Sequence, residues 1–286
     1  MNKARITRNT PAAIVVLIDQ SGSMSEKINH HGTIKTKAQA LAEIVDMMLS
    51  ELLLRCKVEG AYRDYFDIAV LSYSGSGVNS MLTPSIVAPF ISISNLAESF
   101  ICRCNLSRER VLPSGKTIIS TIEQKRWIEP ASNGNTPMFK ALNTTFDMLS
   151  AWLLAHRREN HIAPMVFNIS DGEASDASYA QLEDVAQKIK SLGSPEQQTK
   201  LFNIHLASES EQNVLMFPCN KDNLSTHKYA ELLYDMSSSL PDEYTSYIES
   251  ITLAKATGSF RGVCYNTDMN KLLGILNIGS ASINLL

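Results

Sequence analysis

The stretch Ala12-Ala-Ile-Val-Val-Leu-Ile-Asp19-Gln-Ser21-Gly-Ser23 decides the fold, because an unbroken apolar run leads directly into a polar loop. Continuous hydrophobicity of this length is typical of a strand that is covered on both faces of a parallel sheet. Alternate residues of an extended segment project to the same side, so Asp19, Ser21 and Ser23 can share one face. The stretch therefore predicts a buried strand that ends in three clustered oxygen-bearing side chains.

Apolar runs of the same kind recur along the chain, at 66–73, 165–171, 201–207 and 262–266. Between them lie segments with apolar residues at helical spacing, at 41–53, 138–152, 182–189, 244–251 and 269–276. This alternation predicts an α/β fold, a Rossmann-like, doubly wound, mainly parallel sheet with helices on both faces. We expect a single domain over 1–286 with its core at about 11–276, and an elaboration at about 74–132 that breaks the alternation.

The composition argues against several classes of protein. The 286 residues carry a net charge of −3 without a basic block, so we expect no nucleic-acid surface. The apolar run at 12–18 is too short to cross a bilayer and lacks a small-residue cleavage site, so we expect no membrane segment and no signal peptide. The five cysteines are odd in number and irregularly spaced, which favours reduced thiols and a cytoplasmic protein.

Two further polar loops are expected at the same edge of the sheet. The run at 165–171 leads into Ser170-Asp171-Gly172-Glu173, and Asn133-Gly134-Asn135-Thr136-Pro137 directly precedes the helix predicted at 138–152. Pro137 suits the first turn of that helix, with Thr136 as its N-cap. Ligands of open α/β sheets bind at the carboxyl ends of the strands, so we expect these loops to meet the loop that follows Asp19.

Five oxygen-bearing side chains would meet there, those of Asp19, Ser21, Ser23, Thr136 and Asp171. Hydroxyl and carboxylate oxygens are hard ligands, which favours Mg²⁺, with Mn²⁺ or Ca²⁺ as alternatives. Mg²⁺ takes about six oxygens, which leaves at least one position open for a carboxylate of a partner protein. The less specific interpretation is ordinary loop chemistry, in which the serines form turns and Thr136 only caps a helix.

Together, Asp19-Gln-Ser21-Gly-Ser23, Gly134-Asn135-Thr136-Pro137 and Ser170-Asp171-Gly172 resemble the three-part motif of von Willebrand factor type A (VWA) domains. The resemblance covers about 11–276 and implies a metal-ion-dependent adhesion site (MIDAS). Its ligands would be Asp19, Ser21, Ser23, Thr136 and Asp171. The rim that contacts a partner would be Gly134, Asn135 and Glu173.

The resemblance also has consequences for the sheet and for the biological role. It implies one antiparallel edge strand, at 66–73, hairpinned to a strand near 58–63. Because no signal peptide is expected, the chain is more similar to the intracellular bacterial branch of the family, including proteins of tellurium-resistance clusters. The resemblance to that branch implies a protein that scaffolds partners by presenting a metal ion to an Asp or Glu side chain.

Two other functions stay open. A metal-dependent hydrolase or phosphatase would use the same ion to activate water and would need a general base, for which Glu173, His30 or His31 are the nearby candidates. In the second alternative, the ion would have a purely structural role and would only hold three loops together.

Three other residues have structural interpretations. Asp176 is predicted to cap the helix at 182–189. His205 lies within an apolar run and is expected to be a hydrogen-bonded core residue, and Trp127 is either a core anchor or an interface aromatic.

Overall fold

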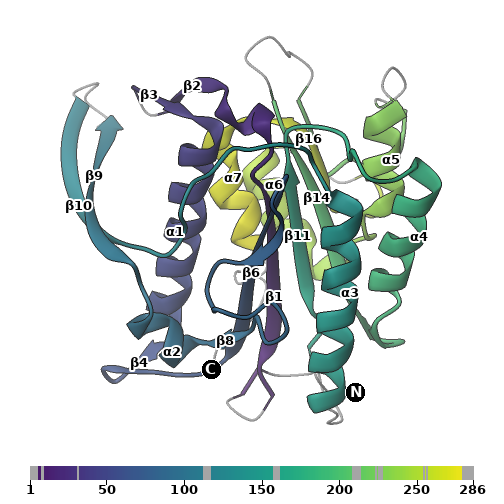
Figure 1. Ribbon diagram of the computed structural model, residues 1–286, viewed down its shortest axis with the longest axis horizontal. Helices are drawn as coiled ribbons and strands as arrows, with labels where there is room; N and C mark the ends of the chain where they lie inside the picture. Colours follow the sequence, from purple (N-terminus) through teal and green to yellow (C-terminus); the bar gives the residue numbers. More distant parts are fainter. Residues whose placement is uncertain are drawn as a thin grey trace.

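The computed structural model describes residues 6–7, 10–30, 32–111, 117–156, 162–207, 214–222, 224, 228–253, 255 and 257–278. Its main element is an eight-stranded sheet in the order β15-β16-β14-β11-β1-β6-β7, with β8 also paired to β6 (Figure 1). Its strands are β1 (Ala12–Asp19), β6 (Phe66–Ser74), β7 (Gly77–Ser80), β8 (Ile91–Ser92), β11 (Met165–Ser170), β14 (Lys200–Leu206), β15 (Leu215–Met216) and β16 (Val263–Thr267). The strands β6, β1, β11, β14 and β16 are mutually parallel along this order. The predicted doubly wound, mainly parallel α/β class is confirmed.

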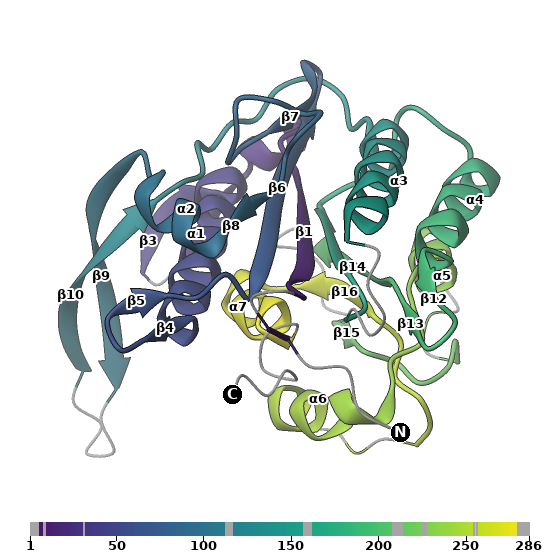
Figure 2. The ribbon, with the colours of Figure 1, turned by 90° about the horizontal axis from the view of Figure 1, so that it is seen from below.

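Different helices cover the two faces of this sheet. They are α1 (Lys37–Arg55), α2 (Ile93–Glu98), α3 (Met138–Ala155), α4 (Tyr179–Lys190), α5 (Lys228–Met236), α6 (Thr245–Thr252) and α7 (Met269–Leu276). Figure 2 shows α1 and α7 on one side of the sheet and α3 and α4 on the other. Since successive side chains of a strand point to opposite faces, Ile14 and Val16 of β1 join the core with α1 and α7, whereas Val15 and Leu17 join the core with α3 and α4.

All the predicted helices are confirmed, as α1, α3, α4, α6 and α7. The helices α2 and α5 were not predicted, although α5 buries Tyr229, Leu232, Leu233 and Met236 at helical spacing. Within the described residues, no helix combines the length and the apolar character that crossing a membrane requires.

The predicted antiparallel edge strand at 66–73 is wrong. This run forms β6, which lies inside the sheet and pairs in parallel with β1 from Ala12↔Phe66 to Asp19↔Tyr73. Antiparallel strands lie outside it, with β7 and β8 against β6 at one edge and β15 against β16 at the other. The expected partner near 58–63 instead folds back on itself as β4 (Lys57–Val58) and β5 (Ala61–Tyr62), because Glu59 and Gly60 turn the chain with φ of 51° and 83°.

The stretch 74–132 contributes β7, β8, α2 and a long antiparallel hairpin of β9 (Cys102–Val111) and β10 (Thr117–Arg126). This hairpin stands beside α1 at one side of the molecule (Figure 1). Trp127, directly after β10, is 1% exposed and donates its indole N–H to the Leu96 carbonyl at 3.0 Å. Trp127 is therefore a core anchor. Two smaller hairpins are β2 (Lys27–His30) with β3 (Thr33–Thr36), and β12 (Gly193–Ser194) with β13 (Gln197–Gln198).

Candidate metal centre

The loop after β1 and the loop before α3 are bound to each other at the carboxyl edge of the sheet, the upper edge in Figure 1. The Gly22 N–H donates to the Gly134 carbonyl at 2.9 Å, and the Asn133 N–H donates to the Gln20 carbonyl at 2.8 Å. Gly134 has a φ of +66°, and a Cβ added to it would lie 2.6 Å from the Gly75 Cα. A side chain at Gly134 would therefore push the loop before α3 away from the turn between β6 and β7, which carries Gly75.

Four of the predicted ligands form one chain of hydrogen bonds. Asp19 Oδ1 accepts the Ser21 N–H at 2.7 Å, and the Ser21 and Ser23 hydroxyls lie 3.0 Å apart. The Ser23 hydroxyl donates to Asp171 Oδ1 at 2.6 Å. Residues far apart in the sequence thus meet as predicted, and the side-chain oxygens of Ser21, Ser23 and Asp171 are joined by hydrogen bonds.

Thr136, the fifth predicted ligand, is joined to the loop after β11 through its backbone. Its N–H donates to the Ser175 hydroxyl at 3.0 Å, and its carbonyl accepts the Ser175 N–H at 3.0 Å. Among the described residues, no hydrogen bond joins the Thr136 hydroxyl to the other four ligands. Thr136 is 9% exposed, so its place at the site rests on the position of these loops.

The capping predicted for this region is wrong in two respects. The helix α3 begins at Met138, with Pro137 as its N-cap residue, so Thr136 is not the cap. Its first N–H groups are instead bound by the Asp176 carboxylate, which accepts from Phe139 at 3.1 Å and from Lys140 at 2.9 Å. Asp176 therefore caps α3 and not α4, because the loop after β11 lies over the start of α3.

The Asp19 carboxylate is the least satisfied polar group of the cluster. Its side chain is fully buried, and burial raises the pKa of Asp19 to about 7. Oδ2 of Asp19 is buried without a hydrogen-bond partner. A buried carboxylate oxygen without a partner is costly, and a cation placed beside it would remove that cost. The donor set consists of carboxylate and hydroxyl oxygens, which fits a hard divalent ion.

The candidate centre offers few carboxylates, which limits how many ligands of this kind an ion there could have. Among the residues that the structure describes, no three His, Cys, Asp or Glu side chains gather as a metal cluster. Asp19 and Asp171 are the carboxylates of the candidate centre, so an ion there would need the hydroxyls as well. Water and hydroxyl ligands are common for Mg²⁺, which seldom has an all-carboxylate shell.

Lys37 belongs to this centre, although it was not predicted from the sequence. Its side chain is 1% exposed, and its Nζ lies 3.3 Å from Asp171 Oδ2 and 2.6 Å from Glu26 Oε2. Lys37 is the first residue of α1, after a capping box formed by Thr36 and Gln39. Its contact with Asp171 joins residues 134 positions apart, and no local pattern indicates such a contact.

The predicted rim lies at the surface. Gly134, Asn135 and Glu173 are exposed, and Oε2 of Glu173 accepts the Tyr179 hydroxyl at 2.7 Å. Tyr229 binds the same loop, since its hydroxyl donates to the Gly172 carbonyl at 2.8 Å. The structure places these groups beside the centre, whereas their contact with a partner stays a prediction.

Two of the histidines considered above are buried. His30, a candidate general base, is 2% exposed at the end of β2. His205 is buried and hydrogen-bonded to the Asn266 side chain at 2.9 Å, which confirms it as a core residue. His31 lies outside the described residues.

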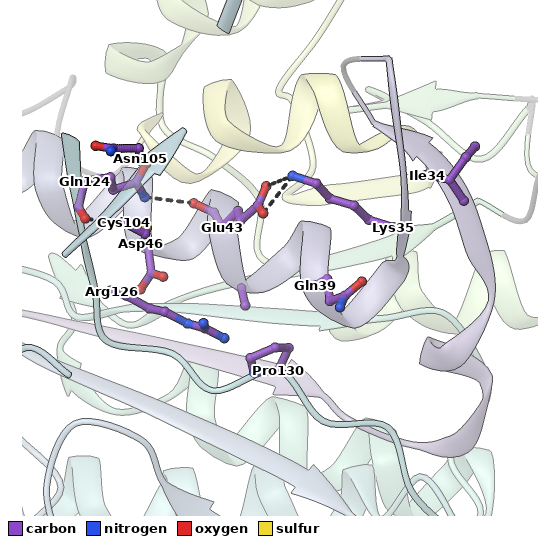
Figure 3. A pocket seen from close by; sticks show the side chains of 11 residues that line it. Ile34, Lys35, Gln39, Glu43, Asp46, Cys104, Asn105, Gln124, Arg126 and Pro130 are labelled. Carbon is purple, nitrogen blue, oxygen red and sulfur yellow. Dashed lines mark hydrogen bonds and ion pairs between the residues drawn. The ribbon is translucent and has the colours of Figure 1, made fainter. Parts of the chain in front are cut away.

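A separate cavity of about 430 Å³ lies between α1, the β2–β3 hairpin and the β9–β10 hairpin (Figure 3). Both oxygens of Glu43 pair there with Lys35, at 2.7 Å and 2.6 Å. Asp46, also on its wall, binds two backbone N–H groups, from Trp127 and Ile128. The acidic groups are thus satisfied within the protein, unlike Asp19, and they do not select a ligand.

No family model and no curated protein matches the chain. Among solved structures, it is similar to a von Willebrand factor type A protein from Catenulispora acidiphila, with 14% identity and a TM-score of 0.39 over 69% of this chain and 34% of that chain. It is similar to the SpRpn10 VWA domain, with 13% identity and a TM-score of 0.38 over 80% of this chain and 84% of that chain.

A further similarity is to the type V pili tip protein Mfa5 from Porphyromonas gingivalis, with 13% identity and a TM-score of 0.33 over 60% of this chain and 22% of that chain. The chain thus spans about a third of the Catenulispora chain and less of the Mfa5 chain. With identities and TM-scores this low, the fold class rests on the strand order of the chain itself.

Proposed function

We propose that the chain is a VWA-type protein-interaction module in which Asp19, Ser21, Ser23, Thr136 and Asp171 hold one Mg²⁺ ion. The observation that carries the proposal is the buried Oδ2 of Asp19, which lacks a partner while its neighbours are hydrogen-bonded. Ser23 and Asp171 already lie within one hydrogen bond of each other, so little rearrangement is needed to turn their oxygens toward a cation. Mn²⁺ or Ca²⁺ fits the same donor set.

A bound divalent ion would supply positive charge and an open coordination position for an Asp or Glu side chain of a partner protein. The residues of the chain would hold that position at the surface, since Ser23, Gly134 and Asn135 are exposed while Asp19 is buried. By resemblance to the tellurium-resistance-type proteins, we extend the proposal to a cytoplasmic scaffold in a bacterial stress response. The hydrolase alternative requires a free general base, and Glu173 already accepts a hydrogen bond from Tyr179.

Titration calorimetry of chelator-treated protein with Mg²⁺ and Mn²⁺ tests the metal centre. We expect about one ion per chain, and we expect Asp19→Ala to abolish binding because it removes the carboxylate with the unpartnered oxygen. Asp184→Asn is the matched control, since Asp184 is an exposed acid of α4 paired with Lys188 at 2.7 Å. Absence of binding to the unsubstituted chain, or equal binding by Asp19→Ala, would refute the proposal.

Acetate tests the open position, because it carries the carboxylate of an acidic side chain. The water-proton relaxation caused by protein-bound Mn²⁺ should fall as acetate is added, since a carboxylate that enters the shell displaces exchanging water. If relaxation is unaffected by acetate although Mn²⁺ is bound, the ion only pins the loops and the partner proposal fails.

A further inference from the structure

Lys37 places a positive charge inside the candidate metal centre. Its side chain is 1% exposed, and its ammonium lies between two carboxylates, 2.6 Å from Glu26 and 3.3 Å from Asp171. The Asp171 side chain is 0% exposed, so it depends on nearby groups to offset its burial. Lys37 offsets that burial, since its Nζ lies 3.3 Å from Asp171 Oδ2.

The same oxygen is one that a divalent ion would attract. An ammonium and a divalent cation drawn to one buried carboxylate repel each other strongly, because the surroundings screen charge less than water does. Glu26 offers Lys37 a second position. Its carboxylate is already closer to the ammonium than Asp171 is, and its side chain is 37% exposed, so it can accept the ammonium without further burial of charge.

We propose that Lys37 is a tethered cation that competes with the divalent ion for Asp171, and that Glu26 draws Lys37 aside when the ion binds. This inference rests on the metal-binding function proposed above and concerns how that site is tuned. The Lys37 ammonium keeps Asp171 compensated without a metal, and Glu26 limits how strongly Lys37 opposes metal entry. Affinity for the ion is therefore set by the balance of Lys37 between two carboxylates.

Substitutions of Lys37 and of Glu26 should change the affinity for Mn²⁺ in opposite directions. Lys37→Met removes the competing charge while keeping an unbranched side chain, and we expect it to bind Mn²⁺ at least about tenfold more tightly than the unsubstituted chain. Glu26→Gln removes the acid that draws Lys37 aside, and we expect it to bind Mn²⁺ about threefold more weakly. Calorimetry with Mn²⁺ alone measures both.

Lys35→Met is the matched control for the loss of one lysine charge. Lys35 lies two residues earlier in the chain and pairs with Glu43 at 2.6 Å, outside the metal centre (Figure 3). Its side chain is 22% exposed, so solvent and salt screen its charge. We expect its Mn²⁺ affinity to stay within about twofold of the unsubstituted chain.

Thermal unfolding adds a readout that does not depend on calorimetry. In chelator, Lys37→Met should unfold at a lower temperature than the unsubstituted chain, because Asp171 and Glu26 lose the ammonium that pairs with them. Mn²⁺ should then raise its unfolding temperature by more than it raises that of the unsubstituted chain. If Lys37→Met does not fold, the Mn²⁺ affinity of Glu26→Gln still tests the inference, because this variant changes a side chain that is 37% exposed and should therefore fold.

The failure of this inference differs from that of the proposed function. If the unsubstituted chain binds Mn²⁺ but Lys37→Met binds it no more tightly, or Glu26→Gln no more weakly, Lys37 is only a structural ion pair and the inference is overturned. If the unsubstituted chain binds no divalent ion, the proposed function fails and this inference fails with it.

Discussion

Asp19 at the end of β1 and Asp46 in the middle of α1 are buried to nearly the same extent, with 0% and 3% of each residue exposed. Burial raises the pKa of both to about 7. They differ in their hydrogen bonds. Oδ1 of Asp46 accepts two backbone N–H groups, from Trp127 at 2.9 Å and Ile128 at 3.1 Å, whereas Oδ2 of Asp19 has no partner.

The difference shows that a buried acid with a raised pKa is not by itself a functional site. Asp46 fastens the end of the β9–β10 hairpin to α1, so its burial is offset by the N–H groups that it satisfies. Asp19 accepts the Ser21 N–H through Oδ1, whereas its Oδ2 is buried without a hydrogen-bond partner. The unpartnered oxygen, and not the pKa, separates a candidate ligand from a structural residue.

The largest expected effect tests this contrast in chelator. Asp46→Ala should lower the free energy of unfolding by about 3 kcal/mol, because it leaves the Trp127 and Ile128 N–H groups buried without an acceptor. Asp19→Ala should change it by less than about 1 kcal/mol, since the loss of the hydrogen bonds to its carboxylate is offset by removal of a buried acid whose Oδ2 has no partner. Urea denaturation at neutral pH measures both variants.

Equal losses for the two variants would break the contrast, because Asp19 would then be as structural as Asp46. Addition of Mg²⁺ extends the comparison. The ion should stabilise Asp46→Ala as much as it stabilises the unsubstituted chain, whereas it should leave Asp19→Ala unchanged.

A smaller effect concerns the pH dependence that Asp46 imposes. Burial raises the pKa of Asp46 from 3.8 to about 7, although the hydrogen bonds from the Trp127 and Ile128 N–H groups lower it. The folded state therefore keeps the proton over a range in which the unfolded state has lost it, so stability falls as pH rises from about 4 to about 7 and then levels off. Asp46→Asn retains the acceptor oxygen but cannot ionise.

We expect the unsubstituted chain to lose on the order of 2 kcal/mol relative to Asp46→Asn between pH 5 and pH 8. The measurement is urea denaturation at a series of pH values, with and without Mg²⁺. Because Asp46 lies outside the metal centre, the ion should not alter this difference. A constant difference across the pH range would show that Asp46 ionises as easily in the folded state as in the unfolded state.

The parts of the fold that were predictable from the sequence are those with local patterns. The unbroken apolar runs predicted β1, β6, β11, β14 and β16, and their spacing from the helical stripes predicted the fold class. The apolar run at 66–73 is itself typical of an interior strand of a parallel sheet, and the structure pairs it in parallel with β1. The wrong pairing there came from the resemblance to a known family, which placed this strand at an antiparallel edge.

In the candidate site too, features with a local sequence pattern were predictable and those that depend on distant contacts were not. The spacing of Asp19, Ser21 and Ser23 is local, and the structure brings them together with Asp171. The roles of Lys37 and Asp176 depend on contacts between loops that are distant in sequence, and neither role was predicted. Thr136 was assigned a helix cap from its position before Pro137, but the neighbouring loop already provides that cap through Asp176.

The smallest expected effect concerns Asp176. Like Asp46, it binds backbone N–H groups, and like Asp19, it lies in a loop that carries a proposed metal ligand. Asp176→Ala should cost about 1 kcal/mol of stability, because α3 loses the carboxylate that binds its first N–H groups. It should also weaken Mn²⁺ binding by a few-fold, since the adjacent Ser175 holds Thr136 and the same loop carries Asp171. Urea denaturation and calorimetry measure the two effects.

Asp268→Ala is the matched control, because Asp268 caps α7 in the same manner by accepting the N–H groups of Asn270 and Lys271 at 2.8 Å and 3.2 Å. Its helix follows β16, which is separated from β11 by β14. Both variants should lose similar stability, but only Asp176→Ala should lose metal affinity. Equal metal binding by the two would show that the cap stabilises α3 without positioning the ligands, and the metal centre would then depend on the Gly22–Gly134 and Ser23–Asp171 contacts alone.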